Sequence, residues 1–443
     1  MSRQVVSAAR RVQGHLRVPG DKSISHRALL LSGVGEGACR IEGLSSSEDV
    51  AASEEALARL GVVIRRSNPQ VEALKHSTRG LEWEILVEGS GWEALRAPEK
   101  PIDCQNSGTT ARTLMGVLAG RPFSTKLQGD KSLSRRPMQR VVGPLREMGA
   151  VIDGNDGGER LPLEIRGGDL KGIEFRSAVA SAQVKTCLLL AGLQASGETS
   201  VAEPAVSRDH TERLLEFLGV SIDKSIDRLV VKATNIRNAS SLSVPGDLSS
   251  AAFLLVAAAI LPGSEVTVEA VGINPTRTGI LDVLRRFGAD VSVANEREVC
   301  GEPWGDVTVK AGDRKPVVVD GDEVVRTVDE LPLVGVLGAF AEGETVIADA
   351  SELRVKESDR IATLATALTA MGAAVEVRPD GMTVKGPAAL RSAAVESAGD
   401  HRIAMAMAVA ALGAEGETSI GDAESAAISY PSFWEDLDRL AER

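Results

Sequence analysis

The sequence of 443 residues contains few cysteines, histidines and aromatic residues. Its four cysteines lie far apart and form no CxxC pair; they are Cys39, Cys104, Cys187 and Cys300. This spacing argues against a zinc site and against a disulfide framework, and it fits a reducing compartment. The five histidines include no pair at metal-ligand spacing, so we expect no bound metal.

Aromatic residues make up only 3% of the chain, and the formal net charge is −12. A nucleic-acid-binding protein needs a basic field and stacking platforms, and this composition offers neither. Long apolar runs are also missing: the longest, residues 251–261, is shorter than the ~18 residues that span a bilayer. We therefore expect no nucleic-acid partner, no membrane partner and a cytoplasmic protein, in which a local basic cluster holds any anionic ligand.

The length and a repeated pattern predict several similar units. Glycine-containing turns lead into β-rich stretches at Gly35, Gly197, Gly263, Gly343 and Gly416, with a weaker case at Gly120. Helices are expected to stop at Gly61, Gly149, Gly219, Gly288 and Gly372, since glycine suits a left-handed helix end. The units recur about every 70 to 80 residues, which indicates copies of one supersecondary element. We predict two similar α/β domains of three units each, residues 20–243 and 244–443, with residues 1–19 forming a strand segment that joins the second domain.

Residues 18–27 read Val-Pro-Gly-Asp-Lys-Ser-Ile-Ser-His-Arg and open an apolar helix. Asp21 or Ser23 suits the N-cap, and Ser23 and Arg27 share a helix face because they are four apart. Cations normally avoid a helix N-terminus. Lys22 and Arg27 beside open N–H groups therefore indicate an anion, most readily a phosphate; an ordinary capped helix with solvated charges is the alternative.

Residues 244–253 repeat this turn, cap and apolar run as Val-Pro-Gly-Asp-Leu-Ser-Ser-Ala-Ala-Phe. The second copy lacks both cations. The turn is thus structural and recurs, whereas the cations belong to the first copy alone. This asymmetry favours a ligand site at the first copy.

Other clusters combine polar or basic residues with predicted helix starts. Residues 106–108, Asn-Ser-Gly, allow backbone N–H groups to approach a ligand, although a plain turn and cap would look the same. Residues 131–136 hold three cations, which would form either a second phosphate clamp or a solvated face. Residues 181–183, Ser-Ala-Gln, suit hydrogen bonds to hydroxyl or phosphate groups, and Arg208 adds another cation.

The second half of the chain adds carboxylates. Asp329 precedes an apolar helix, where acids are ordinarily partners of the helix dipole. Lys356 and Arg360 are four apart and are expected on one helix face beside Glu357. Arg402 opens a further apolar helix. Several basic helix starts that converge would bind two anionic groups, and Asp329 and Glu357 would remain for proton transfer.

Nine motifs in this order resemble the 5-enolpyruvylshikimate-3-phosphate synthase family over essentially the whole chain. They are Pro-Gly-Asp-Lys-Ser-x-x-x-Arg, Asn-x-Gly-Thr, Arg-Pro-Met, Ser-Ala-Gln, Arg-Asp-His-Thr, Asn-Pro-Thr-Arg-Thr-Gly, Asp-Glu, Arg-Val-Lys-Glu-Ser-Asp-Arg and Asp-His-Arg-Ile-Ala-Met. The resemblance implies two domains, each of three βαβαββ repeats in an inside-out α/β barrel of the enolpyruvyl transferase type. It also implies transfer of the enolpyruvyl group of phosphoenolpyruvate to the 5-hydroxyl of shikimate 3-phosphate, through a tetrahedral intermediate in the interdomain cleft, with release of phosphate. No metal or organic cofactor is expected.

The same resemblance assigns residues to the two substrates. It implies that shikimate 3-phosphate is held by Lys22, Ser23, Arg27, Ser181, Ala182, Gln183, Arg208, Asp329 and Lys356. It implies that phosphoenolpyruvate is held by Lys22, Gly108, Arg136, Gln183, Arg360 and Arg402. Asp329 would accept the 5-hydroxyl proton, and Glu357 or Lys22 would protonate the methylene carbon. The family acts in the shikimate pathway of aromatic amino acid biosynthesis and is the target of glyphosate, and we expect a monomer.

The chain departs from the family pattern in places. Many members carry a lysine near residues 427–431, and this chain has none there. Arg208 stands where some members have lysine. The Ser-Ala-Gln-Val-Lys segment resembles that of a subgroup with glyphosate-tolerant members, whereas Gly108 is the small residue typical of sensitive enzymes. We therefore expect glyphosate to compete with phosphoenolpyruvate.

Two other functions fit parts of the pattern. The enolpyruvyl transferase that acts on UDP-N-acetylglucosamine shares the fold but uses a loop cysteine as an acid, and no cysteine here lies in such an Arg/Gly-rich loop. A non-catalytic phosphate-binding repeat protein is the second alternative. Its ligand binding would be indifferent to Asp329 and Glu357.

Overall fold

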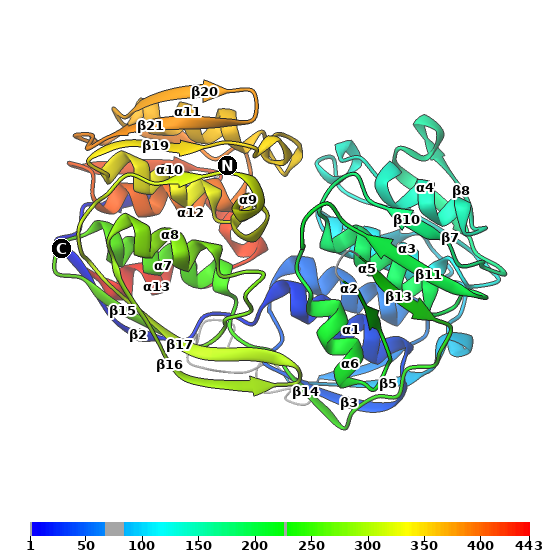
Figure 1. The fold of residues 1–443 in the computed structure, drawn as a ribbon. Helices are drawn as coiled ribbons and strands as arrows, with labels where there is room; N and C mark the ends of the chain where they lie inside the picture. Colours follow the sequence, from blue (N-terminus) through cyan, green and yellow to red (C-terminus); the bar gives the residue numbers. More distant parts are fainter. Residues whose placement is uncertain (1, 67–83, 226–227) are drawn as a thin grey trace. The chain divides into compact units, whose positions relative to one another are not determined.

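A computed structural model describes residues 2–66, 84–225 and 228–443 (Figure 1). The chain divides into two compact units. Unit 1 comprises Met1–Pro19, Pro245–Glu298 and Pro303–Arg443, and unit 2 comprises Gly20–Val244 and Val299–Glu302. The chain therefore passes from one unit to the other at each of the two Val-Pro-Gly-Asp turns.

The described part of unit 2 contains three four-stranded sheets. Its strands are β3 (Glu36–Glu42), β4 (Val63–Arg66), β5 (Ile85–Ser90), β6 (Ile102–Asp103), β7 (Ser124–Gln128), β8 (Val151–Asn155), β9 (Arg160–Arg166), β10 (Glu174–Arg176), β11 (Glu198–Ala202), β12 (Asp223–Lys224), β13 (Leu229–Lys232) and β14 (Ser241–Ser243). The sheet orders are β14-β3-β5-β4, β6-β7-β9-β8 and β10-β11-β13-β12. In each sheet the first two strands are parallel and the remaining pairs are antiparallel. The same strand arrangement therefore occurs three times in unit 2.

Unit 1 repeats this order with two changes. Its strands are β1 (Arg3–Ser7), β2 (Arg11–Leu16), β15 (Glu265–Gly272), β16 (Asp290–Val299), β17 (Glu302–Lys310), β18 (Val318–Val319), β19 (Gly343–Ile347), β20 (Ala374–Arg378), β21 (Gly381–Gly386), β22 (Ala394–Glu396), β23 (Glu417–Gly421) and β24 (Ala441–Glu442). The sheet orders are β16-β17-β15-β2-β24, β18-β19-β21-β20 and β1-β23-β22. The first sheet gains a fifth strand, and the last has three.

Strands from distant parts of the chain complete several sheets. The parallel pairing of β2 with β15 places Gln13 opposite Glu265, and the antiparallel pairing of β1 with β23 places Arg3 opposite Gly421. In unit 2, β14 returns to pair with β3. The last strand, β24, follows the last helix and pairs with β2.

The helices form two classes that differ in burial. In the inner helices most or all residues are buried, whereas the outer helices expose one face. The inner helices are α1 (Lys22–Val34), α3 (Gly108–Leu118) and α5 (Ala182–Gly192) in unit 2, and α7 (Leu248–Ile260), α10 (Leu331–Phe340) and α12 (His401–Leu412) in unit 1. The outer helices are α2 (Glu48–Arg59), α4 (Gln139–Glu147), α6 (His210–Phe217), α8 (Gly279–Phe287), α9 (Gly321–Thr327), α11 (Arg360–Ala370) and α13 (Phe433–Leu440). Short 3-10 helices are η2 (Trp92–Ala94), η3 (Leu133–Arg135), η4 (Asp156–Gly158), η5 (Ser351–Val355) and η6 (Ala423–Ile428).

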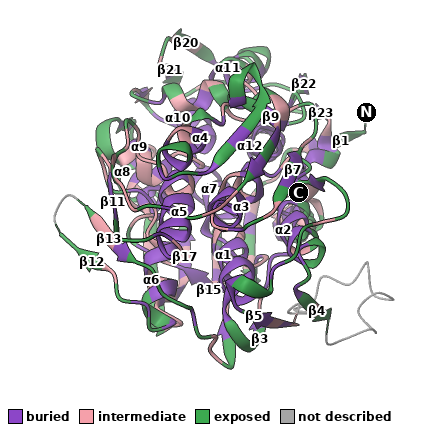
Figure 2. Ribbon diagram, turned by 90° about the vertical axis from the view of Figure 1, so that its right-hand side faces the viewer, coloured by how far each residue is buried: buried purple, intermediate pink, exposed green. Residues whose placement is uncertain are grey.

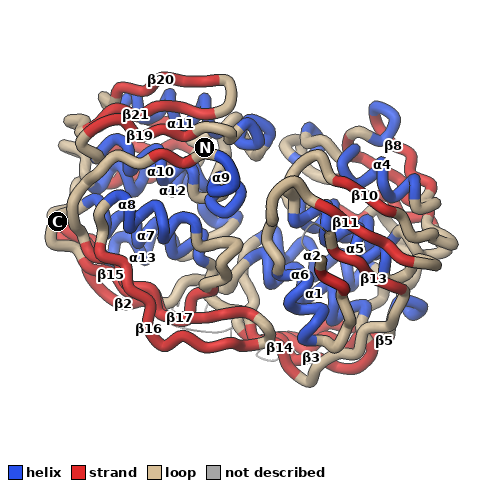
Figure 3. Tube along the Cα trace, in the orientation of Figure 1, coloured by secondary structure: helices blue, strands red, loops and turns tan. Residues whose placement is uncertain are grey.

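Every residue of α7, α10 and α12 is buried, as expected for helices that are apolar on all sides (Figure 2). Within each unit the helices lie between the sheets (Figure 3), and each unit has its own hydrophobic core. Gly61 and Gly288, two of the predicted helix stops, have φ of 92° and 104°, a conformation that favours glycine. The predicted fold class, two similar α/β domains of three βαβαββ repeats, is confirmed.

Candidate active site

The N-terminal end of α1 carries the first cations of the predicted site. Of the two candidate caps, Asp21 caps this helix, because its carboxylate accepts a hydrogen bond from the Ile24 backbone N–H at 2.9 Å. Lys22 Nζ donates to Asp49 Oδ2 at 2.7 Å. The side chains of Lys22 and Asp49 are only 16% and 11% exposed. The Lys22 ammonium is thus fixed at a helix end that already favours anions.

Arg27, one turn further along α1, contacts α5 and α6. Its Nη1 donates to the Ser23 carbonyl oxygen at 2.8 Å, and its Nε donates to Thr211 Oγ1 at 2.7 Å. Its Nη2 donates to Thr186 Oγ1 at 2.8 Å. Arg208 Nη1 lies 3.4 Å from Ser23 Oγ. Two guanidinium groups and one hydroxyl therefore gather beside the start of α1.

Gly108 begins α3, and the neighbouring guanidinium groups require its lack of a side chain. Ser107 caps the helix, since its Oγ accepts from the Thr110 backbone N–H at 3.1 Å. A Cβ on Gly108 would lie 2.9 Å from Arg112 Nη1 and 3.4 Å from Arg136 Nη1. The distance to Arg112 is shorter than an ordinary van der Waals contact, and the distance to Arg136 is at its lower limit. A methyl group here would displace the end of at least one arginine side chain.

Gln183, in the first turn of α5, joins that helix to α3. Its Nε2 donates to Thr109 Oγ1 at 2.9 Å, and its Oε1 accepts from Arg112 Nη1 at 2.7 Å. Arg136 Nη2 donates to Asn106 Oδ1 at 2.6 Å. The starts of α3 and α5 therefore share one polar cluster.

The contacts around α1, α3 and α5 bring together all the site residues predicted in unit 2. They are Lys22, Ser23, Arg27, Gly108, Arg136, Ser181, Ala182, Gln183 and Arg208. Helix N-termini with guanidinium and ammonium groups beside them favour anions with several oxygens, phosphate above all.

The predicted carboxylates of unit 1, Asp329 and Glu357, shortly precede α10 and α11, and the predicted cation Arg402 lies in the first turn of α12. Arg402 Nη1 donates to the Asp329 carbonyl oxygen at 3.0 Å, and Arg402 Nη2 lies 3.5 Å from Asp329 Oδ2. Asp400 caps α12 by accepting from the Arg402 backbone N–H at 2.9 Å. The Asp329 side chain is 15% exposed, so its carboxylate keeps some access while Arg402 fixes its position.

Arg360, the first residue of α11, contacts three carboxylates although its side chain is 1% exposed. Its Nε donates to Asp400 Oδ2 at 2.8 Å, and its Nη2 donates to Glu357 Oε2 at 2.6 Å. Its Nη1 lies 3.8 Å from Asp329 Oδ1. Burial alone would lower the pKa of Arg360, but Asp400 and Glu357 outweigh burial and raise it. One permanent cation thus holds both predicted proton-transfer carboxylates, Asp329 and Glu357.

The expectation that Lys356 and Arg360 share one helix face is wrong. Lys356 follows η5 and has φ −81° and ψ −154°, which is extended backbone. Asp359 caps α11 by accepting a backbone N–H of its first turn, so the helix begins only at Arg360. Burial lowers the pKa of Lys356, against the opposing effect of the nearby Asp329 carboxylate.

Several residues that fix the site were not predicted as part of it: Asp49, Asn106, Arg112 and Asp400. Each contacts a predicted residue that is distant in the sequence, as Arg112 does across 71 residues to Gln183. Asn106 and Asp400 lie inside motifs that the sequence singles out, so their position was a usable signal. Asp49 follows no pattern that predicts its contact with Lys22.

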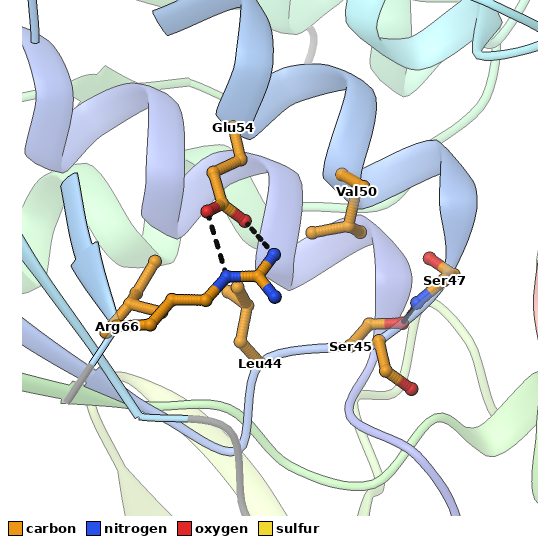
Figure 4. Close-up of a pocket in the computed structure, with 9 residues that line it drawn as sticks. Leu44, Ser45, Ser47, Val50, Glu54 and Arg66 are labelled. Atoms are coloured by element: carbon orange, nitrogen blue, oxygen red, sulfur yellow. Dashed lines mark hydrogen bonds and ion pairs between the residues drawn. The ribbon is translucent and has the colours of Figure 1, made fainter. Parts of the chain in front are cut away.

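A pocket of about 90 Å³ is lined by residues of α2 and of the segments beside it, among them Leu44, Val50 and Glu54 (Figure 4). Glu54 and Arg66 form two hydrogen bonds there, at 3.2 and 3.0 Å. Ligand pockets usually have several hundred Å³. None of the predicted site residues lines this pocket, and we assign it no ligand.

Residues 2–66, 84–225 and 228–443 contain no group of three His, Cys, Asp or Glu placed to hold a metal ion. Within the same ranges no helix is long and apolar enough to cross a membrane.

Comparisons with known proteins agree with the nine motifs. The sequence model of EPSP synthase (3-phosphoshikimate 1-carboxyvinyltransferase) matches residues 6–437. A 3-phosphoshikimate 1-carboxyvinyltransferase of Herpetosiphon aurantiacus is 47% identical over 443 residues, 99% of this chain and 100% of that protein. One of Syntrophotalea carbinolica is 46% identical over 439 residues, 99% of each.

Solved structures agree as well. The structure of EPSP synthase from Acinetobacter baumannii matches with a TM-score of 0.85 and 39% identity, over 99% of this chain and 98% of that one. The enolpyruvyl transferase NikO from Streptomyces tendae, at 19% identity and a TM-score of 0.78 over 98% of this chain and 96% of that one, shares the fold. The resemblance inferred from the motifs is therefore confirmed, and this chain belongs to the EPSP synthase family.

Proposed function

We propose that this enzyme transfers the enolpyruvyl group of phosphoenolpyruvate to the 5-hydroxyl of shikimate 3-phosphate. The products are 5-enolpyruvylshikimate 3-phosphate and phosphate. The observation that carries this proposal is the cluster of cations at the starts of α1, α3 and α5, in a chain that belongs to this family. This reaction is a step of the shikimate pathway of aromatic amino acid biosynthesis, and we expect a cytoplasmic monomer.

Shikimate 3-phosphate is assigned to the cations around α1. The groups proposed to contact it are Lys22, Ser23, Arg27, Ser181, Ala182, Gln183, Arg208, Asp329 and Lys356. The rigid placement of Arg27, through hydrogen bonds to Thr186 and Thr211, supports this assignment. A fixed guanidinium loses little freedom when it binds phosphate oxygens.

Phosphoenolpyruvate, with a carboxylate and a phosphate, needs cations on more than one side. The groups proposed to contact it are Lys22, Gly108, Arg136, Gln183, Arg360 and Arg402. The space left at Gly108 beside Arg112 and Arg136 supports a compact anion at this position. We expect glyphosate, which also carries a carboxylate and a phosphonate, to compete for these groups.

The proposed chemistry begins with addition. Asp329 accepts the proton of the 5-hydroxyl, whose oxygen attacks C2 of phosphoenolpyruvate, and Glu357 or Lys22 protonates the methylene carbon. This gives a tetrahedral intermediate. In the elimination a proton leaves the new methyl group, the C–O bond to phosphate breaks, and the double bond forms again. Fixed cations stabilise the departing phosphate.

Phosphate release from phosphoenolpyruvate tests this proposal, with shikimate 3-phosphate or UDP-N-acetylglucosamine as the acceptor. We expect turnover with shikimate 3-phosphate alone. Turnover with the nucleotide sugar alone would keep the fold and overturn the substrate assignment. No turnover with either acceptor, in protein shown to be folded, would favour a non-catalytic binding protein.

A further inference from the structure

Three ionisable side chains lie buried together in unit 2, and the proposed chemistry uses none of them. Lys185, on α5, donates to Glu212 Oε1 of α6 at 2.8 Å and lies 3.0 Å from Glu203 Oε2. The side chains of Lys185, Glu203 and Glu212 are 3%, 8% and 3% exposed. This group is called the Lys185 cluster below.

The Lys185 cluster is charged in spite of its burial. Burial alone would lower the pKa of Lys185, but the Glu212 and Glu203 carboxylates together outweigh burial and raise it. Buried ion pairs rarely add stability over apolar residues of similar volume, because desolvation costs about as much as the attraction returns. Folding stability therefore explains the presence of these buried charges poorly. The contacts that Glu203 and Lys185 make with neighbouring segments indicate their role.

Glu203 holds two segments of chain. Its Oε1 accepts from the Ser181 backbone N–H at 2.7 Å, and its Oε2 accepts from Ser207 Oγ at 2.7 Å. Lys185 Nζ also donates to the Ser207 carbonyl oxygen at 3.2 Å. The cluster thus fixes the residue that caps α5 and the residue directly before Arg208. Ser181 and Arg208 are both proposed contacts of shikimate 3-phosphate.

A carboxylate in this position needs a counter-charge. Glu203 contacts the backbone of Ser181, a proposed contact of shikimate 3-phosphate. An unpaired carboxylate there would repel the phosphate of this substrate through a medium of low dielectric constant. Lys185 supplies the opposite charge. The second carboxylate, Glu212, attracts the Arg27 guanidinium. Each carboxylate therefore has a cation beside it.

We propose that Glu203 is a positioning residue for the shikimate 3-phosphate site, and that Lys185 keeps its carboxylate from repelling the phosphate. The proposal rests on the proposed function. It requires that changes at these residues affect the phosphorylated acceptor and spare phosphoenolpyruvate.

The test compares Lys185→Met, Glu203→Gln and the double variant by steady-state kinetics in both substrates. Lys185→Met should raise KM for shikimate 3-phosphate at least about 30-fold, because a buried carboxylate loses its partner. Glu203→Gln should raise the same KM about tenfold through weaker hydrogen bonds. The double variant should have a lower KM than Lys185→Met, because the amide removes the repelling charge. KM for phosphoenolpyruvate should stay within about twofold of the wild-type value, since only contacts with shikimate 3-phosphate are affected.

Lys232→Met is the matched control. Lys232 pairs with Glu198 at 2.9 Å in the same unit, but these side chains are 72% and 61% exposed. This variant should leave both KM values unchanged, since exposed ion pairs contribute little. If Lys185→Met does not fold, Glu203→Gln alone decides: its KM for shikimate 3-phosphate must rise.

Three results would overturn the inference. They are unchanged KM for shikimate 3-phosphate in the folded variants, equal rises in KM for both substrates, or a double variant worse than Lys185→Met. In each case the wild-type enzyme still turns over shikimate 3-phosphate. Absence of wild-type turnover would instead refute the proposed function, and this inference with it.

Discussion

Helices α1 and α7 begin with the same turn and serve different purposes. Each follows a Val-Pro-Gly-Asp turn, has 13 residues, and is capped by an aspartate, Asp21 or Asp247. At the position of Arg27 in α1, α7 has Phe253, which packs edge-on against Phe433 with ring centroids 5.8 Å apart. The turn and cap thus determine how a helix starts, and the side chains after them differ: an arginine in α1 and a buried phenylalanine in α7.

The serines one residue after Lys22 and Leu248 show the same difference. Ser249 accepts a hydrogen bond from Arg277 Nη2 at 2.6 Å and donates one to Glu330, so an internal arginine and glutamate surround it. Ser23 instead lies beside the guanidinium groups of Arg27 and Arg208. The start of α7 thus combines one arginine with Glu330, whereas the start of α1 has Asp49 beside Lys22 and two further cations, Arg27 and Arg208. We call the starts of α1, α3 and α5 the binding region, and we call Asp329, Glu357 and Asp400 around Arg360 the carboxylate region.

The largest effect is expected at Asp329, in the carboxylate region. Asp329→Asn removes the proposed base, so kcat should fall about 10²- to 10⁴-fold. KM for shikimate 3-phosphate should change much less, because the cations of unit 2 remain. Steady-state kinetics measure both values. Asp438→Asn, at an exposed pair with Arg443, is the control; a kcat within tenfold of wild type for Asp329→Asn would contradict the assignment.

The next effect compares Arg27 with its counterpart Phe253. Arg27→Met should raise KM for shikimate 3-phosphate at least about 30-fold, because a buried charged contact is lost. Phe253→Leu should lower the free energy of unfolding by about 1 kcal/mol through imperfect packing and leave KM unchanged. Kinetics and urea unfolding of both variants give these values. Equal changes in KM for shikimate 3-phosphate in both variants would contradict the proposal that only the start of α1 binds this substrate.

A smaller effect is expected at Gly108. Its added Cβ would lie 2.9 Å from Arg112 Nη1, so Gly108→Ala must shift a guanidinium. Overpacking of this kind costs about 1–3 kcal/mol, so KM for phosphoenolpyruvate should rise about tenfold. The inhibition constant for glyphosate should rise by a larger factor than this KM. Inhibition curves at several phosphoenolpyruvate concentrations check this. A variant with no gain in tolerance would count against competition at this position.

The smallest effect concerns His26 in α1, whose Nδ1 lies 2.8 Å from Ser53 Oγ. Burial lowers the pKa of His26 well below its usual value, and Lys22 and Arg27 add to this shift. The folded protein holds His26 neutral, whereas the unfolded chain protonates it below about pH 6.5. The free energy of unfolding should therefore decrease as pH falls below that value, by up to about 1.4 kcal/mol per pH unit.

The control for this pH dependence is His26→Asn, which does not titrate. Urea unfolding at pH 7.5, 6.5 and 5.5 should show a smaller loss of stability in the variant than in the wild type. An equal loss in both proteins would mean that other groups cause the pH dependence.

Local patterns predicted the repeated architecture well. The caps Asp21 and Asp247 and the glycine helix stops depend on a few neighbouring residues, and the structure has them where expected. The pairing of β24 with β2 joins the two ends of the chain, Val12 with Ala441, and no local pattern carries that information. Helix α11 was predicted too early because the charge spacing at Lys356 looked helical, whereas the Asp359 cap starts the helix three residues later.

The site was predicted by residue type and completed by contacts that the sequence does not encode locally. Cations at helix starts were visible, so Lys22, Arg27 and Arg402 could be chosen from the sequence. Their partners Asp49 and Thr211 could not, because they come from other helices and from distant parts of the chain. The Lys185 cluster was missed for the same reason.

Lys22→Leu tests the central claim most directly, since it gives α1 the residue that α7 has at the same position. We expect a folded variant with at least about 100-fold lower turnover of shikimate 3-phosphate with phosphoenolpyruvate, because a fixed cation at the reacting phosphate is lost. Turnover within about threefold of wild type would contradict it, and would mean that the first turn, like the second, only starts a helix.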